Sequence, residues 1–125
     1  EEGAEAIALP ARWAFIANLA RYALGLEFCP TAEPSDGLLD GAFFARSGLL
    51  SGLRYLWKIR RGRHVADPSV RCVSGVRFRL ESEQPAAYQL DGDPGGVLPV
   101  EVSVAPGRLR LLVPPSYSRR SKKDR

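Results

Sequence analysis

The sequence is poor in the residues that usually carry metal or nucleophilic chemistry, with no methionine, two cysteines and a single histidine. Cys29 and Cys72 show no Cys-x-x-Cys or Cys/His spacing, so the ligand set of a zinc site is missing. One histidine also leaves no Ser-His-Asp or Cys-His arrangement for nucleophilic catalysis. We therefore expect both thiols to be buried and apolar, in a cytoplasmic protein. His64 is expected to pack or hydrogen-bond at a helix end.

Long apolar runs and nucleotide-binding glycine motifs are missing as well. No stretch approaches the roughly 18 apolar residues of a membrane span, and the first residues do not resemble a signal peptide. Neither Gly-x-x-x-x-Gly-Lys nor Gly-x-Gly-x-x-Gly occurs. Because the chain starts at Glu1 and contains no methionine, we expect it to be a piece of a longer protein.

Charge is unevenly distributed along the chain, whose 125 residues and 45% hydrophobic content are typical of one globular domain. Residues 46–79 contain nine Arg or Lys and one Asp, a net of +8, and residues 116–125 have a net of +4. Such a basic block can attract anionic lipid or nucleotide, although a solvated charged face explains it equally well. Tyr55 and Trp57 lie at helical spacing with leucines, which favours core packing or membrane contact over nucleic-acid binding.

The first half of the chain predicts strands around one helix. Residues 12–19 fit a strand, and a helix remains open because the apolar run is short. Residues 30–37 predict a loop and residues 38–45 a buried strand. We expect a helix over 49–61, with Ser47 or Ser51 as its cap, Leu49, Leu53, Leu56 and Trp57 on one side, Arg54, Lys58 and Arg61 on the other, and Gly62 as its stop.

The second half of the chain alternates apolar and polar residues with the period of a β-strand. This alternation covers residues 76–80 and 100–104. Pro106-Gly107 predicts a turn and residues 109–113 a return strand. Strands dominate, so the predicted fold is mainly β, an antiparallel β-sandwich with one helix. We expect an acidic N-terminal segment over 1–11, the β-sandwich domain over 12–114 and a disordered basic tail over 115–125.

Two acidic turns could carry chemistry. One is Glu33-Pro34-Ser35-Asp36-Gly37-Leu38-Leu39-Asp40, and the other is Gln89-Leu90-Asp91-Gly92-Asp93. Carboxylates and loop carbonyls are the hard oxygen ligands that Mg²⁺ prefers, and a carboxylate near a hydroxyl can act as a general base. An ordinary hairpin turn with solvated aspartates explains the Asp91-Gly92 pair on its own.

Ordered motifs along the chain identify a family resemblance. The sequence resembles the C-terminal lobe of the diacylglycerol kinase family of lipid kinases, which includes bacterial lipid kinases and sphingosine kinases. The resemblance covers about residues 12–114. It rests on Asn18-x-x-x-Tyr22-x-x-Gly25, Pro30, Asp36-Gly37-Leu38-Leu39-Asp40, Arg61-Gly62-Arg63-His64, Gln89-Leu90-Asp91-Gly92-Asp93, Leu98-Pro99-Val100-Glu101-Val102 and Pro106-Gly107-x-Leu109-x-Leu111-Leu112-Val113-Pro114.

The resemblance implies a two-lobed enzyme that transfers the γ-phosphoryl group of ATP to a lipid hydroxyl and requires Mg²⁺. An N-terminal α/β lobe with a Gly-Gly-Asp-Gly-Thr motif would bind most of the ATP, and that motif is absent from this sequence. The lobe alone is then expected to be inactive, because phosphoryl transfer depends on positioning and charge stabilisation. The implied partners are a diacylglycerol-like lipid and the N-terminal lobe, and the basic block adds peripheral contact with an anionic membrane as a further expectation. The alternative is a degenerate, non-enzymatic β-sandwich that binds lipid or protein.

The resemblance also implies roles for particular residues. Asp93 falls at the position of the general base, where the family carries the glutamate of Asp-Gly-Glu. Two further departures from the family pattern are Pro94 and the segment Ala23-Leu24-Gly25. An aspartate reaches about 1.5 Å less far than a glutamate. Asp91, Gly92 and Asn18 fall near the substrate or nucleotide. The Mg²⁺ position corresponds to Glu33, Asp36 and Leu38.

Overall fold

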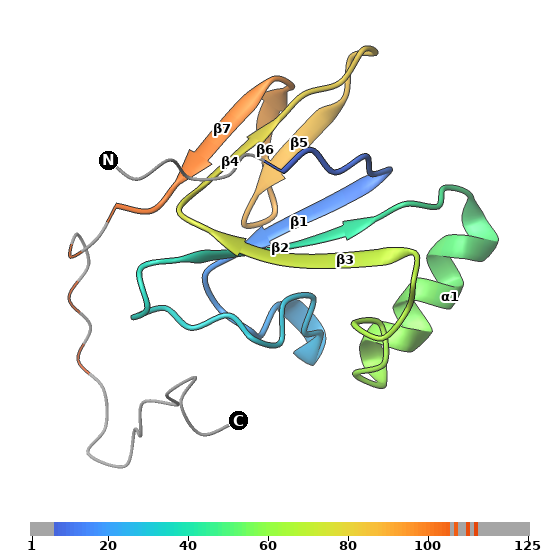
Figure 1. Cartoon of the computed structure of the whole chain (residues 1–125), viewed down its shortest axis with the longest axis horizontal. Helices are drawn as coiled ribbons and strands as arrows, with labels where there is room; N and C mark the ends of the chain where they lie inside the picture. Colours follow the sequence, from blue (N-terminus) through green and yellow to red (C-terminus); the bar gives the residue numbers. More distant parts are fainter. Residues whose placement is uncertain (1–6, 106, 108–109, 111, 113–125) are drawn as a thin grey trace.

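The computed structural model describes residues 7–105, 107, 110 and 112, which form seven β-strands, one α-helix and one 3₁₀ turn (Figure 1). The strands are β1 Trp13–Ala17, β2 Leu39–Phe44, β3 Val70–Gly75, β4 Arg77–Leu80, β5 Ala87–Leu90, β6 Asp93–Val97 and β7 Val100–Ser103. The helix α1 spans Leu49–Arg60, and the 3₁₀ turn η1 spans Ala23–Gly25. Within this part of the chain, no helix has the length and apolar character that crossing a membrane requires.

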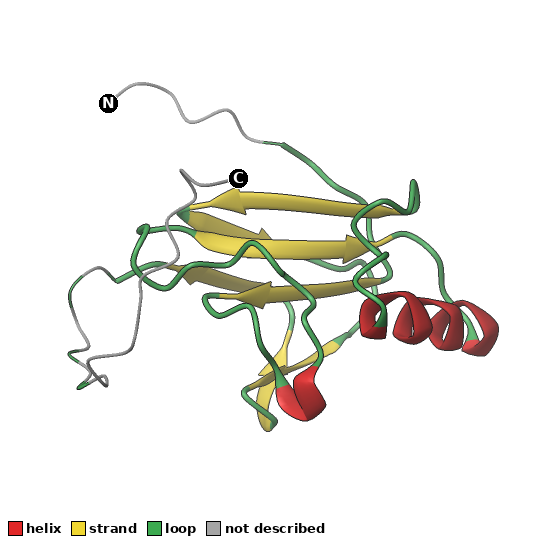
Figure 2. Ribbon diagram, turned by 90° about the horizontal axis from the view of Figure 1, so that it is seen from below, coloured by secondary structure: helices red, strands yellow, loops and turns green. Residues whose placement is uncertain are grey.

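All strand pairs are antiparallel and form three small sheets. The largest sheet has the order β1-β2-β3, while β4 pairs with β7 and β5 pairs with β6. Figure 2 shows α1 lying to one side of the strands. The predicted fold class, mainly β with a single helix, is therefore confirmed, and residues 12–19 contain a strand instead of a helix.

Strand β2 is buried along its whole length because both of its faces are covered. On one face, Ala42 and Phe44 join the hydrophobic core. On the other face, the Phe43 ring packs 6.0 Å from the Phe78 ring of β4, which links the first sheet to the second. Gly41 leaves room for this contact, since a Cβ atom there would lie 3.0 Å from the Phe78 ring. A strand covered on both sides explains why apolar residues follow one another without alternation from Gly41 to Ala45.

The core lies between α1, the β1-β2-β3 sheet and the loop that precedes β2. Its buried members are Cys29, Ala42, Phe44, Tyr55, Ile59 and Val70. The Phe44 ring meets the Tyr55 ring edge-on with centroids 4.8 Å apart, a favoured aromatic geometry. Edge and face contacts between large rings thus fix how α1 sits on the sheet.

The helix differs from its prediction in two respects. Its N-cap is Gly48, at φ 96°, and no side chain caps the first turn, so neither Ser47 nor Ser51 has the expected role. Its buried residues are Tyr55 and Ile59, whereas the predicted leucine face is exposed. Of the two alternatives left open, core packing is confirmed for Tyr55 and is wrong for Trp57 and the leucines. The end of the helix is as predicted, with Gly62 at φ 64° two residues after Arg60.

Strands β3 and β6 were not predicted, because β3 lacks regular alternation and β6 is Asp-Pro-Gly-Gly-Val, a poor strand sequence. Cys29 is buried as expected, but Cys72 is exposed on β3, so the prediction for that thiol is wrong. Pro106, most of the expected return strand 109–113 and the tail 115–125 lie outside the described residues.

Candidate functional site

The second acidic turn is the tip of the β5–β6 hairpin. Asp91 and Gly92 form the two-residue turn, and both have positive φ, 51° and 99°. Positive φ at both central positions is the geometry that Asp-Gly favours in hairpins, because it matches the twist of the strands. The register pairs Leu90 with Asp93, so Asp93 is the first residue of β6 and is exposed. A local turn therefore presents two neighbouring carboxylates to solvent.

The base of this hairpin is shaped by a tyrosine over two glycines. The Tyr88 ring lies against the backbone of Gly95 so closely that a Cβ atom there would clash with it. Gly96 has φ 132°, and a bulge interrupts the register between Tyr88 and Gln89. The glycines after Pro94 thus provide close contact with an aromatic ring, which fixes the direction of the hairpin tip.

The first acidic turn is a hydrogen-bonded loop before β2. Asp36 Oδ1 accepts a hydrogen bond from the Leu38 backbone N–H at 2.9 Å, and Glu33 Oε1 accepts one from the Ser35 hydroxyl at 2.8 Å. Gly37 allows the reversal with φ 76°. The described residues contain no group of three or more His, Cys, Asp or Glu side chains that could hold a metal. A site with two carboxylates and a backbone carbonyl still offers the oxygen donors that Mg²⁺ prefers, so Glu33, Asp36 and Leu38 fit that ion by donor type.

Sheet register brings one further predicted residue toward this loop. Ala17, the last residue of β1, pairs with Asp40 of β2. Asn18 follows Ala17 and is exposed, and Leu38 directly precedes β2, so both lie at the same end of the β1–β2 pair. The structure thus divides the predicted residues between two places, Asn18 with the 33–38 loop and Asp91 to Asp93 on the hairpin.

A buried carboxylate, Asp40, connects the loop to the sheet. Its Oδ1 accepts hydrogen bonds from Ser74 Oγ at 2.7 Å and Thr31 Oγ1 at 3.1 Å. Cys29 Sγ donates to the Asp40 backbone carbonyl at 3.3 Å. Burial, together with the neighbouring Cys72 and Asp40, raises the pKa of Cys29 to about 12. The Cys29 thiol therefore stays protonated at neutral pH and is not a nucleophile.

His64 and Asp67 form a second buried polar centre that the sequence analysis did not assign to a site. His64 is fully buried, and its Nε2 donates to the Phe28 carbonyl at 2.9 Å, because a carbonyl can only accept. Its ring stacks on that of Phe44. His64 is therefore structural, as predicted.

Asp67 is 2% exposed, and its carboxylate forms ion pairs with two cationic side chains of α1. Asp67 Oδ2 lies 2.7 Å from Lys58 Nζ and 2.8 Å from an Arg54 guanidinium nitrogen, and Oδ1 accepts from the Ser69 N–H and hydroxyl. Burial by itself would raise the pKa of Asp67, but the Lys58 and Ser69 hydrogen bonds and the Arg54 charge hold it well below the ordinary 3.8. Asp67 is the single acid among nine basic residues in 46–79, and this composition is the sequence signal that could have indicated an ion pair.

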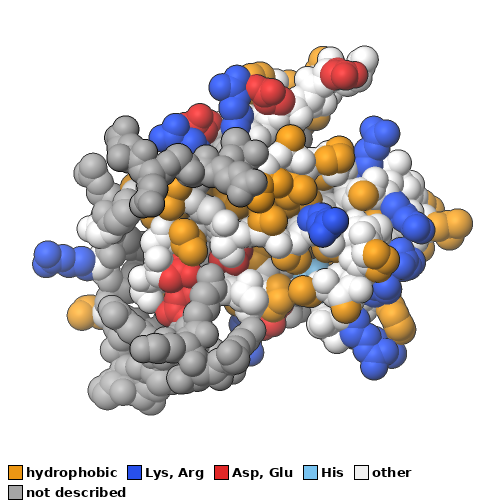
Figure 3. Space-filling model, viewed as in Figure 1, with side chains coloured by type: hydrophobic (Ala, Val, Ile, Leu, Met, Phe, Trp, Pro, Cys, Tyr) orange, Lys and Arg blue, Asp and Glu red, His pale blue; other side chains and the backbone are white. Residues whose placement is uncertain are grey.

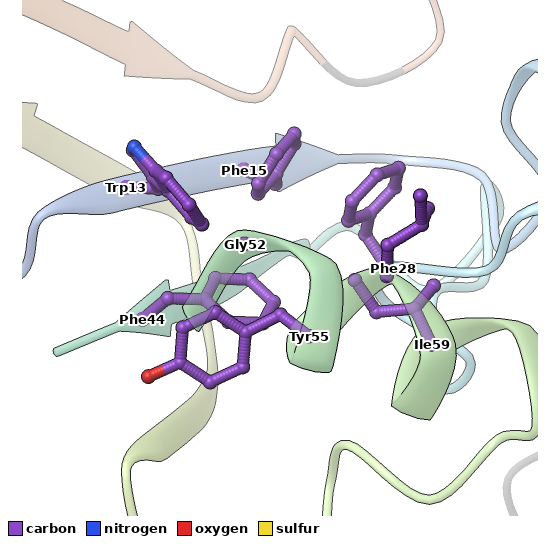
Figure 4. A pocket seen from close by; sticks show the side chains of 8 residues that line it. Trp13, Phe15, Phe28, Phe44, Gly52, Tyr55 and Ile59 are labelled. Atoms are coloured by element: carbon purple, nitrogen blue, oxygen red, sulfur yellow. The ribbon is translucent and has the colours of Figure 1, made fainter. Parts of the chain in front are cut away.

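An apolar cavity of about 360 Å³ lies between β1 and α1. Figure 4 shows aromatic side chains pointing into it from both elements, with Gly52 facing Trp13. A Cβ atom at Gly52 would lie 2.8 Å from the Trp13 ring, so this glycine allows the close approach. The lining residues are Trp13, Phe15, Phe28, Phe44, Gly52, Tyr55, Leu56 and Ile59. Such a cavity suits a hydrocarbon group better than a polar ligand.

Two comparisons with known proteins agree on a family. Residues 3–113 match the family model described as the YegS C-terminal NAD kinase β-sandwich-like domain. The chain is also 33% identical over 113 residues to proteins named diacylglycerol kinase from two strains of Mycobacterium tuberculosis, CDC 1551 / Oshkosh and H37Rv. These matches cover 90% of the chain but 36% of each relative, so the chain spans about a third of their length. The chain therefore belongs to the YegS and diacylglycerol kinase family, as its C-terminal β-sandwich-like domain.

Proposed function

We propose that this chain is the C-terminal lobe of an ATP- and Mg²⁺-dependent lipid kinase that phosphorylates the hydroxyl of a diacylglycerol-like lipid. The observation that carries the proposal is the exposed hairpin tip, where Asp93 stands beside Asp91 and Gly92. A carboxylate in this place can accept the proton of an attacking hydroxyl once the hydroxyl comes within hydrogen-bond distance. The relatives that share the domain carry the name diacylglycerol kinase, which supports the choice of reaction.

The exposure of Asp93 suggests what the remainder of the enzyme supplies. A general base works best in a site that excludes water and holds the phosphate in line with the hydroxyl. We propose that the N-terminal α/β lobe provides both conditions and binds most of the ATP, with Asp91, Gly92 and Asn18 facing the cleft. The isolated lobe would then be inactive.

The lipid half of the proposal is supported by the apolar cavity. Its lining is almost entirely aromatic or aliphatic, and 360 Å³ is the volume of a small-molecule site. An acyl chain can fill this space at little cost because none of the described residues that line it carries a charge. The substrate of such an enzyme resides in a membrane, so cytoplasmic location with peripheral contact to an anionic membrane forms part of the proposal.

The direct test is an assay of the intact protein that contains this chain. Diacylglycerol dispersed in detergent, ATP and MgCl₂ are expected to yield a phosphorylated lipid, identified by mass spectrometry. The 125-residue chain by itself should give no product, and omission of MgCl₂ should abolish turnover. Binding of diacylglycerol by an intact protein that makes no product would instead support the non-enzymatic lobe.

The Mg²⁺ ligands can be tested without an activity measurement. When bound, Mg²⁺ would neutralise the two carboxylates and fix the 33–38 loop. MgCl₂ is expected to raise the melting temperature of the protein by about 5 °C, because a ligand that binds only the folded state stabilises it. Asp36→Asn should remove this increment. The amide oxygen retains an acceptor for the Leu38 N–H.

For each variant, the quantity compared is the difference in melting temperature with and without MgCl₂, so a change in the stability of the metal-free protein does not affect the comparison. Glu83→Gln removes an exposed carboxylate from another loop and should leave the increment intact. An equal MgCl₂ effect in Asp36→Asn and wild type would contradict the ligand assignment.

A further inference from the structure

The outward side of α1 is apolar over its first two turns. Leu49 and Leu50 are 80% and 84% exposed, and Leu53 is 56% exposed. Leu56 and Trp57 follow on the same side and are about half exposed. A helix on the surface of a globular protein normally presents polar residues there. Five exposed apolar side chains on adjacent turns therefore indicate a surface that is covered in use.

Two of the helix cations are already committed within the domain. Arg54 and Lys58 both point to the buried Asp67, so they stabilise the domain and cannot serve as the free cations of the helix. The remaining cations, Arg60 and Arg61, lie at the C-terminal end of α1 and have no acidic partner among the described residues. The Arg61 guanidinium lies over the Trp57 ring, 4.5 Å from its centroid.

The charge around this surface has one sign. The sequence contains no Asp or Glu from 41 to 66, a range that holds six arginines and lysines. Figure 3 shows Lys and Arg side chains together with hydrophobic ones over the end of the molecule where α1 lies. A protein partner of mixed charge would not require this arrangement, whereas an anionic surface is complementary to it.

We propose that α1 docks on an anionic phospholipid bilayer through its outer face, formed by Leu49, Leu50, Leu53, Leu56, Trp57, Arg60 and Arg61. This inference rests on the proposed lipid kinase function and locates the membrane contact. The leucines and Trp57 enter the boundary between headgroups and acyl chains, and the two arginines bind lipid phosphates. The electrostatic part of the contact therefore depends on Arg60 and Arg61 and not on Arg54 and Lys58, which are paired with Asp67.

The position of the cavity fits this orientation. Leu56 and Trp13 line the cavity and are also partly exposed, so the cavity adjoins the docking face. A lipid leaving the bilayer beside α1 would reach apolar side chains without crossing water, which avoids the cost of exposing its acyl chain.

The test measures binding of the intact protein to vesicles of phosphatidylcholine alone or mixed equally with phosphatidylglycerol, using flotation. Wild type is expected to bind the anionic vesicles, with affinity that falls as NaCl rises. Arg60→Gln/Arg61→Gln should bind roughly thirtyfold more weakly, because each basic residue near an anionic surface contributes about 1 kcal/mol. Leu50→Glu/Leu53→Glu should lose at least about tenfold in affinity.

Matched control variants show whether a loss of vesicle binding is specific to the outer face of α1 or follows from any change in surface charge or hydrophobicity. Arg71→Gln/Arg79→Gln removes two exposed arginines of the sheets, and Leu24→Glu changes a leucine that is 91% exposed; both should bind like wild type. Trp57 emission should shift to shorter wavelength on vesicle binding, and Trp57→Phe should lose that shift.

Unchanged vesicle affinity in both α1 double variants would overturn the proposal. Two other results would also overturn it if vesicle binding did not change. A lower melting temperature of the variants would assign this face to packing against another segment of the protein, and a change from dimer to monomer would assign it to a second copy. Flotation does not depend on catalysis. A protein that binds vesicles through α1 but phosphorylates no lipid would refute the kinase proposal alone.

Discussion

Asp93→Ala in the intact protein is expected to lower kcat for lipid phosphorylation by roughly 10²- to 10⁴-fold, the usual contribution of a general base. The KM values for ATP and lipid should change little, because the proton is transferred only in the transition state. Asp93 is exposed at the start of β6, so the variant should melt within about 1 °C of wild type. A steady-state assay with detergent-dispersed diacylglycerol measures the effect.

Two further variants make the Asp93 experiment decisive. Glu83→Ala removes an exposed carboxylate elsewhere and should keep full activity. Asp93→Glu should be at least as active as wild type, because the longer side chain extends the carboxylate by about 1.5 Å toward the hydroxyl. Turnover by Asp93→Ala at the wild-type rate would remove Asp93 from the mechanism.

Asp67→Ala should be strongly destabilising, costing about 3 kcal/mol of unfolding free energy. The carboxylate is buried and holds Lys58, Arg54 and Ser69 at once. Tyr55 joins this network, since its hydroxyl donates to Ser69 Oγ, whose own hydrogen goes to Asp67. The loss lies at the lower end of the range for buried pairs because Arg54 and Lys58 keep some contact with water. Urea titration measures it.

An exposed ion pair provides the control for Asp67. Glu101→Ala breaks the pair with Arg77, in which both side chains are about half exposed or more, and should change stability by less than about 1 kcal/mol. Equal effects of the two alanine variants would show that Asp67 does not anchor α1.

The pH dependence of the unfolding free energy provides a second test of the ion pairs between Asp67 and α1. The pKa of Asp67 is lower in the folded state than the ordinary 3.8, so folding favours the ionised carboxylate. Its contribution is fully present above the unfolded pKa and declines as pH falls below it toward the folded value. Asp67→Asn cannot ionise, so its stability deficit relative to wild type should be constant near pH 7 and shrink progressively below about pH 4. A deficit independent of pH would contradict the ionic role.

Much of the local structure could be predicted because it depends on neighbouring residues. The Asp91-Gly92 turn follows from the backbone freedom of that pair, and the strands at 77–80 and 100–103 follow from alternation. Strand β6 could not be predicted in the same way. Its Pro94 and two glycines are poor strand residues, and pairing with β5 under the Tyr88 ring holds them extended.

The mainly β class, the position of the helix, the two acidic turns and the family of the chain could all be inferred from the order of its residues. These features are encoded in short windows, where periodicity, turn chemistry and motif order act without distant contacts. By contrast, the folded chain was needed to show that Tyr55 and Ile59 face the core, that Cys72 is exposed and that Asp67 binds Arg54 and Lys58. Whether a side chain is buried or ion-paired depends on which residues from a distant part of the chain pack against it. The side chains of one helix therefore divide between core, ion pair and solvent in a way that spacing cannot specify.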